Sequence, residues 1–363
     1  MKQIQYILLS LVATFFIAPA IINILYSLKF RQKGKDEVDQ VIKERKKKIG
    51  VPVMGGLMIL ISVISLYFVL GLYQKLGYIP VIIFGLGGGL GFVDDFMNVF
   101  SREKRNNVEV YEKVNPIIYR NFFTWTLFRY ITWPARVFTG SVDEAGSYQT
   151  GMRASQKLFF EILLSVLIAY LFYLGFGGEM WIPIVGIVDL GWFSVVVNSC
   201  LLVLFSMGFS VTDGLDALSA GTHAIGFALM GILAAMLGYE SVSLFCMLIV
   251  GSELTFYYFN IPPARVEMGD IGTIPLGMLF VYVAMLTERS LITPIIGFIF
   301  VAEVLSSILQ WLSSVFLLKK IFKMAPIHHH FEVLGWSQEK IVMRFYFIAI
   351  GAGLAGILLA MSL

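Results

Sequence analysis

Long stretches of apolar residues, separated by short polar connections, dominate this chain. A helix needs about 20 mostly apolar residues to cross the hydrocarbon core of a bilayer. About ten stretches approach this length, which predicts an all-α polytopic membrane protein. They lie near residues 6–28, 52–72, 77–93, 157–174, 192–209, 219–238, 241–259, 271–287, 291–318 and 341–363. The ninth is long and contains Glu303 and Gln310, so we expect it to be bent or broken.

The positions of the cations predict which way the bundle faces. A dense basic run follows the first stretch, made of Lys29, Arg31, Lys33, Lys35, Lys43, Arg45, Lys46, Lys47 and Lys48. Cytoplasmic connections are enriched in Lys and Arg, so this connection is expected in the cytoplasm and both termini outside. With this parity, all of the 27 Lys and Arg residues except Lys2, Lys75 and Arg289 fall on or next to the cytoplasmic side.

The same predicted orientation places polar clusters from four connections on one face of the bundle. These clusters are Asp94 with Asp95, Asp213 with Asp216, the segment from Asn260 to Asp270, and His328 with His329 and His330. Functional residues that are scattered along a chain and gather on one face of a bundle indicate a single site. We therefore predict one active site on the cytoplasmic face.

Composition supports a bilayer rather than water as the surroundings. Hydrophobic residues make up 58% of the chain and charged residues 14%, well below the share usual in soluble domains. The net charge of +3 is small, and we expect no nucleic-acid partner. The whole chain, 1–363, is interpreted as a single domain with a long insertion at 96–156. Within it, residues 119–134 are aromatic and basic, which favours an interfacial amphipathic helix over a re-entrant hairpin.

Two adjacent carboxylates end the third apolar stretch, where residues 91–96 read Gly-Phe-Val-Asp-Asp-Phe. Carboxylates at a bilayer boundary are costly unless they are hydrated, paired or bound to metal. Adjacent helical residues point about 100° apart. Asp94 and Asp95 are therefore expected to serve different partners, one a metal and the other a substrate or lysine, unless they only form a solvated helix end.

Two later segments add further carboxylates. Asp213 and Asp216 are three residues apart, which places both on one face if the segment is helical. A helix-capping role for Asp213 is the alternative. Residues 259–272 mix Pro, Gly and polar groups, and the glycines on either side of Asp270 allow close backbone approach. Asn260 opens this segment. We interpret it as part of the site rather than an ordinary turn.

Three consecutive histidines, His328, His329 and His330, follow the ninth stretch. Zinc sites usually use spaced histidines, so we expect these imidazoles, on a loop, to donate hydrogen bonds to phosphate or to act as acid or base. Lys157 and the basic run that ends at Lys48 lie near the acidic clusters in the predicted topology. Carboxylates with lysines suit phosphate chemistry with Mg²⁺, which prefers oxygen ligands and bridges carboxylates to phosphates.

At this point the ordered motifs resemble the polyprenyl-phosphate N-acetylhexosamine-1-phosphate transferases. The matching segments are residues 50–56 (Gly-Val-Pro-Val-Met-Gly-Gly), 92–95 (Phe-Val-Asp-Asp), 212–216 (Thr-Asp-Gly-Leu-Asp), Asn260 with Pro263 and Ala264, and 268–272 (Met-Gly-Asp-Ile-Gly). Residues 324–332 (Met-Ala-Pro-Ile-His-His-His-Phe-Glu) are similar to the branch of phospho-N-acetylmuramoyl-pentapeptide transferases. The resemblance spans nearly the whole chain.

The resemblance implies ten transmembrane helices in the bacterial inner membrane and a peptidoglycan-synthesis reaction. Phospho-MurNAc-pentapeptide would pass from UDP-MurNAc-pentapeptide to undecaprenyl phosphate, giving lipid I and UMP, with Mg²⁺ required. Membrane lipids surround such an enzyme, and a homodimer is a further expectation.

The resemblance also implies a role for each matching residue. Asp270 would be a metal ligand. Asp94 would act as base or nucleophile with Asp95 beside it, and Lys157 would contact the site. Asp213, Asp216 and Asn260 would lie on the nucleotide side, and His328, His329 and His330 would reach the substrate.

The chain departs from the family pattern at three positions. Ser210 stands where Asn is usual, Glu267 where an aromatic residue is usual, and Asn98 where Lys is common. We expect these changes to alter nucleoside contacts or inhibitor sensitivity rather than the reaction type. The competing interpretations are a sister transferase that uses UDP-N-acetylglucosamine, a transporter or channel, and an inactive homologue kept as a scaffold. A transporter would carry its acidic groups at mid-membrane.

Overall fold

The computed structural model describes residues 1–31, 50–101, 152, 154–183 and 185–362. Each predicted apolar stretch contains helix. The elements are α1 (Lys2–Ser27), α3 (Gly56–Val69), α4 (Tyr73–Leu76), α5 (Ile79–Ile82), the π-helix η2 (Ile83–Gly87), α6 (Gly88–Ser101), α10 (Ala154–Phe176), β1 (Glu179–Ile182), β2 (Gly186–Asp189), α11 (Phe193–Thr212), α12 (Leu218–Met236), α13 (Glu240–Asn260), α14 (Asp270–Leu286), the 3₁₀-helix η5 (Ser290–Ile292), α15 (Thr293–Ile296), α16 (Phe298–Phe316), α17 (Ile327–Val333) and α18 (Gln338–Met361). Lys48, the predicted interfacial helix at 119–134 and most of the 96–156 insertion lie outside the described residues.

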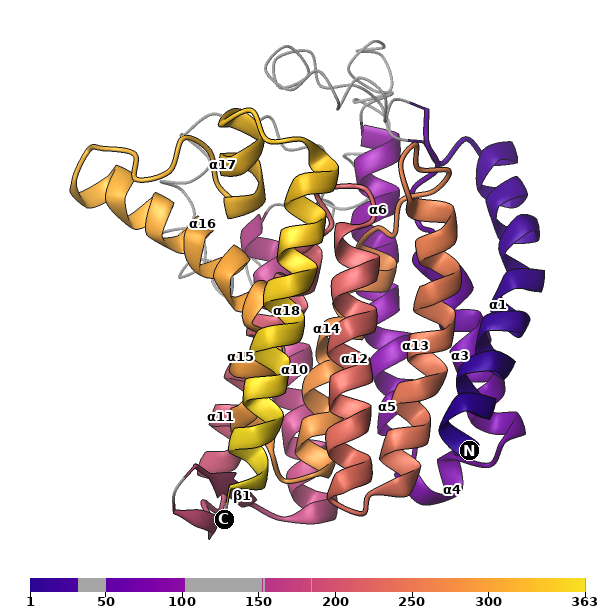
Figure 1. Cartoon of the computed structure of the whole chain (residues 1–363), viewed down its shortest axis with the longest axis vertical. Helices are drawn as coiled ribbons and strands as arrows, with labels where there is room; N and C mark the ends of the chain where they lie inside the picture. The colour runs from indigo at the N-terminus through magenta and orange to yellow at the C-terminus, as the bar shows by residue number, and fades with distance from the viewer. Residues whose placement is uncertain (32–49, 102–151, 153, 184, 363) are drawn as a thin grey trace, which may run out of the picture.

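The long helices run side by side, and both termini lie at the same end of the bundle (Figure 1). Within the described residues, eight helices are long and apolar enough to cross a membrane. The helices α3 and α14 are shorter, with 14 and 17 residues. Most of α14 is buried, so protein rather than lipid surrounds it. The prediction of an all-α polytopic membrane protein is confirmed, whereas the side of the membrane that each end faces stays a prediction.

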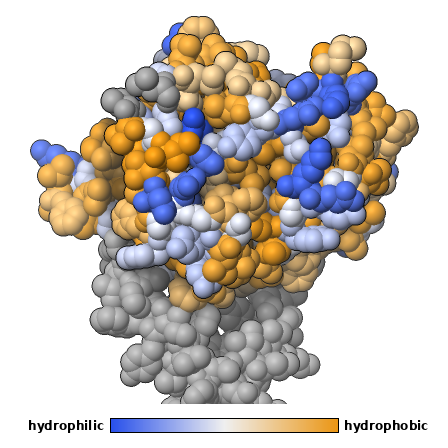
Figure 2. Space-filling view, turned by 90° about the horizontal axis from the view of Figure 1, so that it is seen from below, coloured by the Kyte–Doolittle hydropathy of each residue, from blue (hydrophilic) through white to orange (hydrophobic). Residues whose placement is uncertain are grey.

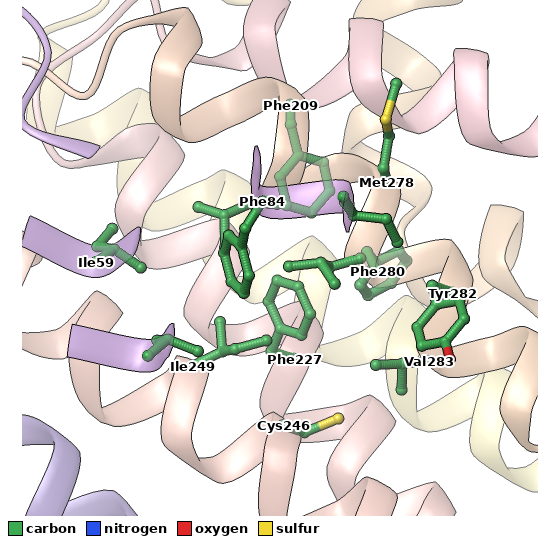
Figure 3. Close-up of a cluster of buried hydrophobic side chains, with 14 of the residues drawn as sticks. Ile59, Phe84, Phe209, Phe227, Cys246, Ile249, Met278, Phe280, Tyr282 and Val283 are labelled. Atoms are coloured by element: carbon green, nitrogen blue, oxygen red, sulfur yellow. The ribbon is translucent and has the colours of Figure 1, made fainter. Parts of the chain in front are cut away.

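The centre of the bundle is packed with aromatic side chains from four helical segments (Figure 3). Phe84 comes from η2, Phe209 from α11, Phe227 from α12 and Phe280 from α14. The ring of Phe280 lies 5.7 Å from that of Phe209 and 5.6 Å from that of Phe227, measured between centroids. Lipid tails are as apolar as these rings, so the helices are held together by close packing rather than by transfer from water.

The third membrane segment is continuous from α5 to α6, but it contains the π-helical turn η2. A π turn adds one residue to the helical ladder, and such turns are frequent at functional sites. The added residue rotates everything after it relative to a regular α-helix, including Asp94 and Asp95. Gly87 lies in this turn, where an added Cβ would be 3.3 Å from Cα of Pro275. The turn therefore fits against α14.

The ninth segment is broken, as predicted. Helix α15 ends at Ile296, Gly297 leaves the helical conformation, and α16 departs from the bundle at a steep angle (Figure 1). A Cβ on Gly297 would be 2.4 Å from the Phe205 ring, so the break lies where the chain passes close to α11. The result is a helix that projects sideways and supports α17.

Seen from the end that carries the termini, hydrophilic residues form separate patches among hydrophobic ones (Figure 2). The antiparallel hairpin of β1 and β2 lies at this end (Figure 1). It is joined to the connection after α14, because the Trp181 N–H donates to the Glu288 carbonyl over 2.8 Å. The Arg289 guanidinium also lies 4.8 Å from the centre of the Trp181 ring. Short connections close this end, and the candidate site residues lie toward the other.

Candidate active site

Three charged side chains from three helices meet in the half of the bundle away from the termini. Lys157 of α10 places its Nζ 2.6 Å from Asp270 Oδ2 and 4.0 Å from Asp94 Oδ2. Asp94 belongs to α6, and Asp270 is the first residue of α14. The side chains of Lys157 and Asp270 are 22% and 17% exposed, so a ligand can reach them. The structure brings together three residues that the sequence placed in different connections.

Asp94 is held on both oxygens. Its Oδ1 accepts a hydrogen bond from the Met152 N–H over 2.8 Å. Its Oδ2 accepts one from the Asn98 side-chain amide over 3.4 Å, one helical turn further along α6. Asn98 is one of the departures from the family pattern, and here it contacts the carboxylate of Asp94. With 5% of its surface exposed, Asp94 is oriented by protein contacts.

Asp95 points in another direction, as the helical spacing predicted. Its Oδ2 accepts a hydrogen bond from the Ile271 N–H over 3.0 Å. The first backbone N–H groups of a helix have no partner within the helix, and a carboxylate there is favoured by the helix dipole. Asp95 thus stabilises the start of α14, the turn that carries Asp270.

Glycines let the backbones approach each other around Asp270. A Cβ on Gly91 of α6 would lie 2.1 Å from the Asp270 carbonyl oxygen, and one on Gly56 would lie 2.4 Å from Cα of Gly272. The Gly55 N–H donates to the Glu267 carbonyl, and the Gly56 N–H donates to the Met268 carbonyl. The motif at 50–56 is therefore a backbone clamp on the segment that leads into α14.

The segment that carries Asp213 and Asp216 is not helical, so the condition for a shared helical face is not met. Helix α11 ends at Thr212, and the next residues form turns up to Ala217, whose φ is 69°. Asp213 accepts hydrogen bonds from the Ser219 hydroxyl over 2.6 Å and from the Gly269 N–H over 3.2 Å. Asp213 is therefore tied to the residue that precedes Asp270.

Asp216 and Asn260 tie the same turn to the segment after α13. Asp216 Oδ2 accepts from the Ala264 N–H over 3.3 Å. The Asn260 side-chain oxygen accepts from the Ala217 N–H over 2.8 Å, and its side-chain nitrogen donates to the Val266 carbonyl over 2.9 Å. Both ends of the Asn260 amide thus contact backbone, an arrangement that holds two segments of the site together.

The histidines lie on a short helix, α17, and not on a loop as expected. His328 Nδ1 lies 2.9 Å from Glu303 Oε2, and the ring is fully buried. His329 contacts Glu332, and His330 Nδ1 accepts from the Lys323 N–H over 3.1 Å. A Cβ on Gly214 would lie 2.2 Å from His328 Nε2. The glycine between Asp213 and Asp216 therefore lets the histidine helix approach the acidic turn.

Several residues in contact with the site were not assigned to it from sequence. From the sequence, Glu303 was used only to predict a bend in the ninth stretch. A carboxylate in an apolar stretch is itself a signal of function, and it could have indicated a role in the site. The Ser210 hydroxyl lies 2.9 Å from the Thr273 hydroxyl, which in turn lies 3.4 Å from Asp270 Oδ1. Serine and threonine are common in membrane helices, so no sequence signal distinguished Thr273.

The donor set fits a metal ion that is shared with a substrate. Among the described residues, no three His, Cys, Asp or Glu side chains form a group able to enclose an ion. Mg²⁺, however, commonly uses one or two carboxylates and completes its coordination with water and substrate phosphates. Asp270, next to the Lys157 ammonium, supplies such a carboxylate.

The chain is similar to known enzymes along nearly its whole length. Residues 126–288 match the family model described as glycosyl transferase family 4. A phospho-N-acetylmuramoyl-pentapeptide-transferase of Halalkalibacterium halodurans is 34% identical, over 95% of this chain and 93% of the relative. The enzymes of the same name from Staphylococcus aureus strains RF122 and MSSA476 are 32% identical, over 97% of each chain.

These similarities confirm the enzyme class that was predicted from the motifs, a phosphoglycosyl transferase embedded in the bacterial membrane. They favour this class over a transporter or channel. The chain belongs to the phospho-N-acetylmuramoyl-pentapeptide-transferase family.

Proposed function

We propose that this chain transfers phospho-MurNAc-pentapeptide from UDP-MurNAc-pentapeptide to undecaprenyl phosphate, forming lipid I and releasing UMP for peptidoglycan synthesis. The observation that carries the proposal is the Lys157 ammonium between Asp94 and Asp270 toward one end of a membrane bundle. A soluble nucleotide and a lipid phosphate can meet at such a place. Enzymes of phosphoryl transfer work mainly by positioning their reactants and by placing charge against phosphate oxygens.

The reaction exchanges one pyrophosphate bond for another. An oxygen of the lipid phosphate attacks the phosphorus that carries the sugar, and the bond from this phosphorus to the UMP oxygen breaks. The bonding electrons and the negative charge leave with UMP. We assign Asp94 to the acceptor, either as the base that takes its proton or as a nucleophile that attacks first. Both roles need the same carboxylate in the same place.

We assign Asp270 as the residue that would hold Mg²⁺. When bound, the ion would supply positive charge against the donor pyrophosphate. Lys157 supplies a further positive charge beside the same carboxylate. Asp95 keeps Asp270 in place through its hydrogen bond to the first turn of α14.

The turn from Asp213 to Asp216 and the histidine helix form the nucleotide side of the proposed site. Support comes from the Asp213 hydrogen bond to Gly269 and from the contact of Gly214 with His328. Asn260 positions the segment rather than contacting the donor, because its amide contacts backbone at both ends. His328, His329 and His330 are assigned to substrate contact, and the basic residue Lys48 to the approach of phosphate.

We place this end of the bundle in the cytoplasm, where the nucleotide donor is found. Support comes from the basic connections, which fall on this side in the predicted topology. The same end meets the lipid headgroups, where undecaprenyl phosphate exposes its phosphate. A homodimer stays a prediction.

The test is a UMP-release assay on the full-length protein in detergent with undecaprenyl phosphate and Mg²⁺. UDP-MurNAc-pentapeptide is expected to turn over and UDP-N-acetylglucosamine is not. The Asp270→Asn variant is expected to lose about a thousandfold in rate, because it loses both the lysine contact and a metal ligand. Turnover of the second donor instead would assign the chain to the sister transferases, and turnover of neither would support the scaffold interpretation.

A further inference from the structure

A further carboxylate, Glu161, lies deeper in the bundle than Lys157. Glu161 follows Lys157 by four residues on α10, so it is one helical turn away on the same face. It is 1% exposed. Both of its oxygens are buried and have no hydrogen-bond partner among the described residues. A carboxylate in a membrane segment is costly unless a partner compensates it, so its surroundings indicate what that partner is.

The neighbours of Glu161 form a polar strip between α10 and α11. Ser206 of α11 lies beside the carboxylate. Ser165 lies one turn further along α10, and its hydroxyl is also buried without a hydrogen-bond partner in the described part of the chain. Serine hydroxyls cannot neutralise a carboxylate. The cation beside Glu161 on α10 is Lys157, one helical turn earlier, which also contacts Asp270 and Asp94.

Lys157 contacts the carboxylate that would hold the metal ion. The ammonium lies 2.6 Å from Asp270 Oδ2, and Asp270 is the residue we assign to Mg²⁺. A divalent ion on Asp270 would repel the ammonium, and two positive charges in a partly buried site destabilise each other strongly. Asp94 Oδ2 lies 4.0 Å from the same ammonium but is assigned to the acceptor, so a further carboxylate within reach of the flexible lysine side chain would stabilise the displaced charge.

We infer that Glu161 is a positioning residue that holds the Lys157 ammonium whenever a metal ion occupies Asp270. The inference rests on the proposed function for its assignment of Asp270 to the metal. Glu161 stabilises the displaced ammonium, so the metal binds more tightly than it would beside an unpaired lysine.

The test measures Mn²⁺ binding to the full-length protein in detergent by electron paramagnetic resonance, without substrate. Glu161→Gln is expected to weaken Mn²⁺ binding by at least about fivefold, the lower range for coupling between two sites. Lys157→Met is expected to strengthen Mn²⁺ binding although it lowers the rate of UMP release. The double variant is expected to bind Mn²⁺ like Lys157→Met alone, because Glu161 acts through the lysine.

Two further variants separate this role from a packing role. Glu161→Asp keeps the charge and is expected to bind Mn²⁺ more nearly like the wild-type protein than Glu161→Gln does. Glu253→Gln is the matched control, since Glu253 is another fully buried carboxylate and contacts His223 over 3.3 Å. Its Mn²⁺ affinity is expected to be unchanged.

The inference is overturned if Glu161→Gln leaves Mn²⁺ binding unchanged, or if it weakens binding equally with and without Lys157. Either result is independent of the donor specificity, because no substrate is present. The proposed function fails separately, if the wild-type protein releases no UMP from UDP-MurNAc-pentapeptide.

Discussion

The carboxylate cluster and the histidine helix are held in place by different means. Around Asp270 the backbones themselves are in contact, because Gly91 of α6 and Gly56 of the 50–56 motif have no side chain at the points of closest approach. Around His328 the contacts are made by side chains, including those of Glu303 and Ser306 of α16, a helix that projects away from the bundle (Figure 1). Backbone contact leaves little freedom to adjust, whereas a projecting helix held by side-chain contacts can shift.

This difference agrees with the roles that we propose. The residues around the reacting phosphates need to be placed to within a fraction of an ångström. A helix that contacts a large substrate benefits from freedom to move, because the donor must enter and UMP must leave. Substitutions that disturb the rigid region should therefore cost more activity than those in the histidine region.

Among the substitutions that compare the two regions, the largest effect is expected from Gly91→Ala. The new Cβ would lie 2.1 Å from the Asp270 carbonyl oxygen, so α6 and α14 must move apart and Asp94 moves away from Asp270. A displacement of about 1 Å reduces rates by about a hundredfold. We expect such a loss in UMP release. Gly89→Ala is the matched control, since nothing lies within 4 Å of its Cβ, and it should keep wild-type activity. Equal activity of both variants would show that the close approach is not needed.

A smaller effect is expected from Glu303→Gln. Glutamine keeps a side-chain oxygen near His328 Nδ1 but removes the charge that orients the ring. Loss of an outer partner that orients a histidine typically costs about tenfold or more. We expect kcat for UMP release to fall by about tenfold. Ser307→Ala, which removes a hydroxyl bonded to the Glu303 carbonyl, serves as the control and should have little effect. A kcat for Glu303→Gln equal to that of the control would contradict a role for this contact.

The smallest effect is expected from Glu267→Phe, which restores the aromatic residue usual in the family. The backbone of Glu267 pairs with Pro52 and Gly55, and this substitution leaves those hydrogen bonds in place. Stacking of an aromatic ring on a base contributes about 1–3 kcal/mol. We therefore expect KM for the UDP donor to fall by about fivefold and nucleoside inhibitors to bind more tightly. If the wild-type protein already binds such inhibitors as tightly as ordinary family members do, the departure at Glu267 has no bearing on the nucleoside.

Several features of the site could be predicted because they depend on local geometry. The divergence of Asp94 and Asp95 follows from the helical turn, and the break in the ninth segment was indicated by its length and its polar residues. The shared face of Asp213 and Asp216 depended on a helical segment, and α11 ends one residue before Asp213. The loop expected for the histidines was wrong because Pro326 precedes a short helix rather than continuing an irregular segment. Sequence periodicity cannot show where a helix ends or begins within a polar segment that separates two helices.

The sequence by itself determined that the chain spans a membrane many times and that its reactive residues gather at one end. Length, hydropathy and charge decide these properties, and each is local to a segment. Only the tertiary structure decided which reactive residues touch. The π turn in the third segment sets the direction of Asp94, and Gly91 sets the distance between α6 and α14. Lys157 lies among carboxylates from three helices because segments far apart in the chain pack directly against one another. The sequence of one segment alone cannot predict such a contact.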